Sequence, residues 1–73
     1  MPLKPLPFRE VKRKLEAAGF VEVRRKGSYV KFLKETPEGR RVVIVPCHSE
    51  MAVGTLRSIL RQAGLSAEEF DRL

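Results

Sequence analysis

The chain has 73 residues, enough for one domain whose core lies near the lower limit for folding without disulfides or metals. Its apolar content of 42% excludes wholesale disorder, and a formal net charge of +6 favours a polyanionic partner or an acidic protein. A single cysteine excludes an internal disulfide, and because no signal-peptide pattern or membrane-spanning apolar run is visible, we expect a cytoplasmic protein.

The first segment predicts an extended arm over residues 1–7, followed by one domain over residues 8–73. Three prolines in the arm deny its backbone helix and ladder hydrogen bonds. From Phe8, apolar residues recur at spacings of three and four, which predicts an amphipathic helix to about Ala18. Gly19 suits the left-handed conformation that ends helices. The basic residues 12–14 are either a solvated helix face or a nucleic-acid contact, for which Lys12 is the candidate.

Three strands are expected next, over residues 20–25, 29–34 and 41–45. Residues 36–39 read Thr-Pro-Glu-Gly, which favours a type I turn between the second and third strands. An antiparallel meander is therefore predicted. Its third strand is expected to be the most buried, because apolar residues occupy both of its faces.

The C-terminal part predicts two helices. Apolar residues at helical spacing follow Gly54 and continue to Ala63, where Gly64 ends the segment. Residues 66–69, Ser-Ala-Glu-Glu, form a capping-box pattern that predicts a short helix from Ala67 to about Leu73. The order α-β-β-β-α plus a short C-terminal helix, with a three-stranded antiparallel sheet, indicates a two-layer α+β fold.

The residues best suited to function lie around the turn between the first two strands. A basic run precedes a Gly-Ser pair that can bring backbone N–H groups to a phosphate. Tyr29 and Lys31 should then share one face of the following strand, opposite Val30 and Phe32, since successive side chains alternate. This face suits a nucleic-acid backbone. The candidate nucleic-acid-binding residues are Lys12, Arg24, Arg25, Lys26, Gly27, Ser28 and Lys31.

The chain resembles the HicA family of type II toxin–antitoxin toxins over nearly its whole length. The matching segments are Gly19-Phe20, Gly27-Ser28, Lys31-Phe32, Val43-Ile44-Val45-Pro46 with His48, Gly54-Thr55-Leu56-Arg57, Ile59-Leu60, Ala63-Gly64-Leu65-Ser66 and Glu69-Phe70. The resemblance implies a fold like the double-stranded-RNA-binding domain and an mRNA-cleaving activity that needs no cofactor. It also implies neutralisation by a HicB-type antitoxin.

The resemblance also assigns the catalytic position. Family members typically carry a catalytic histidine just after the Gly-Ser pair, where this chain has Tyr29 followed by Val30. Histidine exchanges protons near neutral pH, whereas the ordinary pKa of a tyrosine is about 10. Two alternatives could replace the histidine. In the first, the neighbouring cations favour the phenolate of Tyr29, or they stabilise the developing charge while Tyr29 donates a hydrogen bond. In the second, His48 reaches the same site. Other roles stay open for both residues. His48 can hold its loop by hydrogen bonds. Tyr29 can stack on an unpaired base or be an ordinary strand tyrosine.

Three functions are therefore considered. The first is an RNA endonuclease toxin, the second an RNA-binding module of the same fold that has lost cleavage, and the third a protein whose basic face mainly receives an acidic antitoxin. Cys47, His48 and Glu50 lack the spacing of a zinc site, so no metal is expected. Neither Cys47 nor Ser28 has the sequence context of a nucleophile.

Overall fold

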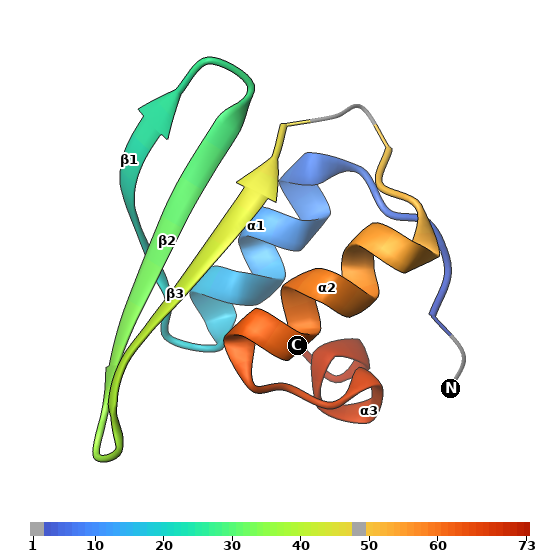
Figure 1. Cartoon of the computed structure of the whole chain (residues 1–73). Coiled ribbons are helices and arrows are strands. Elements are labelled where there is room, and N and C mark those ends of the chain that lie inside the picture. Colours follow the sequence, from blue (N-terminus) through green and yellow to red (C-terminus); the bar gives the residue numbers. More distant parts are fainter. Residues whose placement is uncertain (1–2, 48–49) are drawn as a thin grey trace.

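Three antiparallel strands and three helices form in the predicted order (Figure 1). The computed structural model describes residues 3–47 and 50–73. The elements are α1 (Phe8–Ala17), β1 (Val21–Lys26), β2 (Tyr29–Thr36), β3 (Gly39–Pro46), α2 (Val53–Ala63) and α3 (Ala67–Asp71). The sheet has the strand order β1-β2-β3, and the helices lie together on one of its faces. The predicted two-layer α+β fold is confirmed.

Helix α1 ends where Gly19 was expected to end it. Gly19 has a φ of 103°, a backbone conformation that residues with a Cβ rarely adopt. The Phe20 N–H donates to the Leu15 carbonyl at 3.0 Å, and the Gly19 N–H donates to the Glu16 carbonyl at 3.0 Å. These are the two bonds of a Schellman motif. They fold Phe20 back into the core, where it is buried.

Two-residue turns set the register of the sheet. Lys26 pairs with Tyr29 across the Gly27-Ser28 turn, and Thr36 pairs with Gly39 across the next turn. Strand pairing thus extends to the turns, so β2 and β3 run past the predicted ends at residues 34 and 45. Gly27 has a φ of 58°, and Ser28 has a negative φ, the pattern of a type II′ hairpin turn.

The prediction that β3 is the most buried strand is wrong. Val43 and Val45 are buried, but Val42 is 37% exposed and Ile44 is 41% exposed. A sheet covered on one face buries every second residue, whatever the hydropathy of the residues between them. Strand β2 lies in the centre of the sheet and buries Val30 and Phe32 on the same face.

The N-terminal arm is extended where the structure describes it, and it is tied to the domain. Leu6 and Met51 exchange two backbone hydrogen bonds, at 3.2 and 2.7 Å, as an isolated antiparallel bridge. The predicted absence of ladder bonds is therefore wrong at Leu6, because this residue lies between two prolines and keeps its own N–H. None of the described helices is long and apolar enough to cross a membrane.

The C-terminal helix is fixed at both ends. The Ser66 hydroxyl accepts from the Glu69 N–H at 3.0 Å, and the Glu69 carboxylate accepts from the Ser66 N–H at 2.9 Å, which confirms the predicted capping box. The helix ends at Asp71, two residues before the predicted end. Phe70 is buried and closes the core beneath α1 and α2.

Candidate nucleic-acid interface

A β-bulge at Val23 decides which basic side chains face outward. Glu22 pairs with Phe32, and Arg24 pairs with Lys31, so Val23 has no partner of its own on β2. Without the bulge, strict alternation from Val21 would place Arg24 on the helix-covered side with Glu22. The extra residue reverses the alternation, so Arg24 and Lys26 share the open face.

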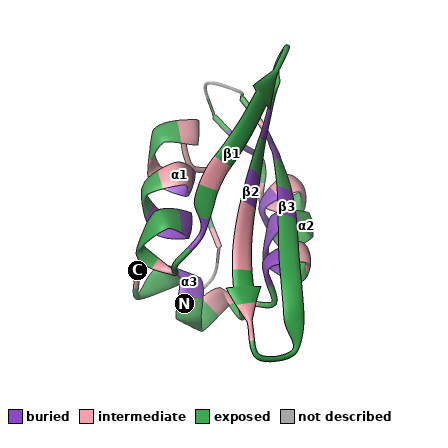
Figure 2. Cartoon of the chain, turned by 90° about the vertical axis from the view of Figure 1, so that its left-hand side faces the viewer, coloured by how far each residue is buried: buried purple, intermediate pink, exposed green. Residues whose placement is uncertain are grey.

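The open face brings four of the candidate residues together. Arg24 lies opposite Lys31, and Lys26 lies opposite Tyr29, and residues directly opposite each other in an antiparallel pair point to the same side. With Ile44 of β3 they line a shallow hollow of about 230 Å³. Tyr29 is 56% exposed. Figure 2 shows exposed residues in green along the strands that carry this hollow.

The three cations of this hollow are available for a ligand. Within residues 3–47 and 50–73, no ion pair includes Arg24, Lys26 or Lys31. Like charges held on adjacent strands repel one another, and a bound polyanion relieves that repulsion. The arrangement can therefore hold phosphate groups beside an exposed aromatic ring.

Arg25 points to the opposite side and is engaged there. Its position opposite Val30 places it on the helix-covered face, where its guanidinium lies 5.6 Å from the centre of the Phe8 ring. Its Nε lies 3.5 Å from a Glu22 carboxylate oxygen, and its Nη1 lies 3.8 Å from the Cys47 Sγ. Arg25 thus joins the edge of the sheet to the start of α1 and to the end of β3.

Lys12 belongs to the same network as Arg25. Its Nζ lies 3.2 Å from the other Glu22 carboxylate oxygen. Hydrogen bonds from Lys12 and then Arg25 hold the pKa of Glu22 below its ordinary value. The structure therefore does not bring Lys12 and Arg25 together with the other predicted nucleic-acid-binding residues, because both form ion pairs with Glu22 on the covered side. No pattern in the sequence indicates this role of Glu22, because it depends on contacts between β1 and α1.

The Gly27-Ser28 turn packs against the segment that follows β3. The Cys47 N–H donates to the Ser28 carbonyl at 2.6 Å, so the two chain segments meet beside Tyr29. The predicted alternative catalyst His48 lies outside the described residues. Among the described residues, no group of three His, Cys, Asp or Glu side chains is placed to hold a metal ion.

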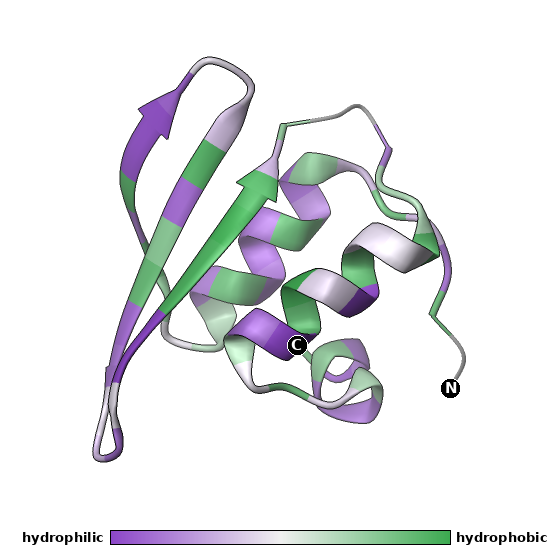
Figure 3. Cartoon of the chain, viewed as in Figure 1, coloured by the Kyte–Doolittle hydropathy of each residue, from purple (hydrophilic) through white to green (hydrophobic). Residues whose placement is uncertain are grey.

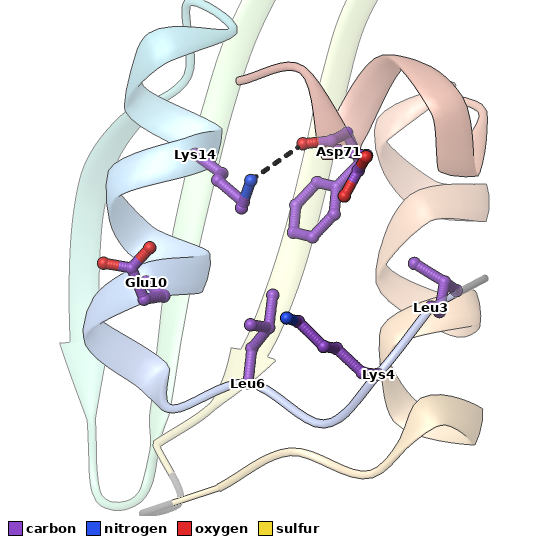
Figure 4. Close-up of a pocket in the computed structure, with 7 residues that line it drawn as sticks. Leu3, Lys4, Leu6, Glu10, Lys14 and Asp71 are labelled. Atoms are coloured by element: carbon purple, nitrogen blue, oxygen red, sulfur yellow. Dashed lines mark hydrogen bonds between the residues drawn. The ribbon is translucent and has the colours of Figure 1, made fainter. Parts of the chain in front are cut away.

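A second hollow, of about 280 Å³, lies between the arm, α1 and α3 (Figure 4). Lys14 is buried beside it and donates from Nζ to the carbonyls of Phe70 and Leu73, both at 3.1 Å. The same Nζ lies 5.3 Å from the centre of the Phe70 ring. Lys14 was expected in an exposed basic cluster, but its position three residues after buried Val11 puts it on the inner side of the helix. Its contacts hold α3 against α1.

The comparison with known families agrees with this architecture. A family model described as "HicA toxin of bacterial toxin-antitoxin" matches residues 8–65. The match spans α1 to the end of α2 and includes every residue of the hollow on the open face. No curated protein matches the chain.

Proposed function

The chain belongs to the HicA family of toxins of bacterial toxin–antitoxin systems, and from this membership we propose that it binds and cleaves mRNA without a metal ion. The HicB-type antitoxin that neutralises it, and the cytoplasm as the place of action, are parts of the same proposal. The observation that carries the proposal is the hollow on the open face, where Arg24, Lys26 and Lys31 surround the exposed Tyr29.

The electrostatics of the hollow suit RNA. Phosphate contacts supply much of the affinity for nucleic acids, and aromatic rings add stacking with unpaired bases. An unpaired cation keeps its full attraction for a phosphate, whereas one already bound to a carboxylate must first give up that partner. We therefore assign RNA binding to Arg24, Lys26 and Lys31 ahead of Arg25 and Lys12. The Gly27 and Ser28 backbone borders the same hollow through its neighbours Lys26 and Tyr29.

Cleavage requires proton transfer at this site. Metal-independent cleavage forms a bond between the ribose 2′-oxygen and phosphorus and breaks the bond from phosphorus to the 5′-oxygen. The 2′-hydroxyl loses a proton, and the leaving oxygen gains one. Tyr29 occupies the position that the resemblance gives to the catalytic histidine. Its hydroxyl can donate a hydrogen bond to the phosphate, while the neighbouring cations stabilise the charge that develops there.

The tyrosine favours a second candidate function, an RNA-binding module of the same fold with impaired cleavage. Loss of one acid–base group typically lowers a rate by about 10² to 10⁴. Single-turnover cleavage of a labelled mRNA in EDTA separates the two functions, with the unchanged chain compared with Tyr29→His. We expect Tyr29→His to cleave faster than the unchanged chain by about 10² to 10⁴.

Matched variants control this experiment. Tyr29→Phe keeps the ring and removes the hydroxyl, so equal rates for it and the unchanged chain would exclude a catalytic hydroxyl. Lys26→Glu combined with Lys31→Glu should abolish RNA retention as well as cleavage. Retention that survives this double change would rule out the open face as the RNA site.

The antitoxin is expected to bind the same cations as RNA. Complementary charge accelerates association and fixes the register of an interface. A HicB-type antitoxin that covers the hollow is expected to present carboxylates to Arg24, Lys26 and Lys31. Binding of the antitoxin should then become weaker in the variant Lys26→Glu, Lys31→Glu.

A further inference from the structure

The open face carries an aliphatic row next to the basic hollow. Val21, Leu33 and Val42 are register partners across all three strands, so their side chains lie side by side on one face. Val21 is 61% exposed, and Val42 is 37% exposed. Ile44 follows two residues after Val42 and extends the row toward the hollow. Figure 3 shows the apolar residues of β3 as a continuous green segment.

This row is unsuited to RNA. Aliphatic side chains have no charge for phosphates, no hydrogen-bonding group for base edges and no π-face for stacking. Single exposed apolar residues are ordinary on protein surfaces, but contiguous apolar patches are often sites of contact with another protein. The row therefore suits contact with a protein that presents aliphatic side chains of its own.

The neighbouring charges determine what kind of protein fits. Ile44 is the register partner of Lys31, so the aliphatic row runs directly into the group of cations. A second copy of this chain packed face to face would bring like charges together, and each copy has a formal net charge of +6. An acidic partner instead places carboxylates on Arg24, Lys26 and Lys31 while its aliphatic side chains cover the row.

We infer that the row of Val21, Leu33, Val42 and Ile44 is the apolar anchor for the antitoxin, an acidic protein that lies across the open face of the sheet. The inference rests on the proposed function for the identity of its partner. It adds that the contact is anchored by β1, β2 and β3 together, and that Val21, Leu33 and Val42 of this anchor lie outside the hollow assigned to RNA. Antitoxin binding and RNA binding then have separable determinants on one surface.

The test compares two ligands on the same variants. The probes are the purified protein encoded by the gene adjacent to that of this chain and a labelled mRNA, each titrated against the full chain. The variant Val21→Thr, Val42→Thr keeps β-branching and replaces one methyl group of each side chain with a hydroxyl group. The control Val53→Thr makes the same change at the start of α2, in the helical layer. Circular dichroism and thermal melting check that all variants are folded.

We expect the double valine variant to bind the adjacent protein about tenfold more weakly, as for two methyl groups lost from a buried contact. The affinity of the double valine variant for RNA should stay within about twofold of that of the unchanged chain. The affinity of Val53→Thr for RNA should do the same. Unchanged affinity for the adjacent protein, no complex with it at micromolar concentration, or dimerisation of the unchanged chain through this row would each overturn the inference. If the unchanged chain retains no RNA but its complex with the adjacent protein depends on the row, the proposed RNA function fails and the docking surface stands.

Discussion

The two faces of β1 use the same residue type in opposite ways. Arg24 lies on the open face beside Lys31 and is in no ion pair among the described residues. Arg25, its neighbour in the chain, lies on the covered face and contacts Glu22, Phe8 and Cys47. One guanidinium is available for a ligand, and the other contacts residues of α1, β1 and the segment after β3.

Charge along a strand therefore does not reveal function until each side chain is assigned to a face of the sheet. The bulge at Val23 makes that assignment, because it turns Arg24 and Lys26 outward and Arg25 inward. Bulges are often found next to functional sites for this reason. Changes on the covered face should therefore affect folding, and changes on the open face should affect binding.

The largest effect is expected when the comparison is made on β2. Phe32 is fully buried, so Phe32→Ala should lower the free energy of unfolding by about 3 to 5 kcal/mol, through lost transfer energy and the cavity left behind. Tyr29→Ala, on the same strand but on the open face, should lower it by about 1 kcal/mol or less. Urea unfolding followed by circular dichroism measures both values. Equal losses for the two variants would show that the open face is not open in solution.

A smaller effect is expected in the salt dependence of RNA binding. Each phosphate contact with a single strand contributes about 0.7 to the slope of log affinity against log salt. Lys26→Gln on the open face should reduce this slope by about that amount, whereas Lys12→Gln should leave it nearly unchanged because Glu22 already holds Lys12.

Filter binding at several salt concentrations measures both slopes with one labelled RNA. The two variants remove the same charge and differ only in the face that carried it. A larger change for Lys12→Gln than for Lys26→Gln would place the RNA on the helical side of the molecule. The helical side would then bind RNA, and the open face of the sheet would not.

Much of the fold could be predicted because local rules act alone there. The alternation of Tyr29, Val30, Lys31 and Phe32 follows from strand geometry, and the structure confirms it. The end of α1 follows from Gly19, since few other residues tolerate a φ of 103°. The capping box at Ser66 is likewise a local pattern that acts within one turn of helix.

The rest could not be predicted because it depends on contacts between distant segments. The bulge at Val23 is visible only once β1 is aligned with β2, and without it the basic run has no correct assignment of faces. The exposure of Val42 and Ile44 depends on which side of the sheet the helices cover. Lys14 is buried because the carbonyls of Phe70 and Leu73 meet its ammonium, some 56 and 59 residues further along the chain. Hydropathy alone assigned it to the surface.

The smallest expected effect concerns the covered-face network at low pH. Hydrogen bonds from Lys12 and Arg25 lower the pKa of Glu22 in the folded chain, so folding favours its charged form. This contribution to stability is present above the pKa of an unfolded glutamate, about 4.3, and is lost as the pH falls through the lower folded value. The unchanged chain should therefore lose more stability than Glu22→Gln between about pH 5 and pH 3.

Thermal melting of both proteins across this range measures the difference, which should be small because the groups are exposed and should shrink further in high salt. At neutral pH, Glu22→Gln should melt at a lower temperature than the unchanged chain, and the two curves should converge toward pH 3. Parallel curves would mean that Glu22 does not hold Lys12 and Arg25 in solution. Both cations would then be available to a ligand, and the contrast between Arg24 and Arg25 would rest on the direction of their side chains alone.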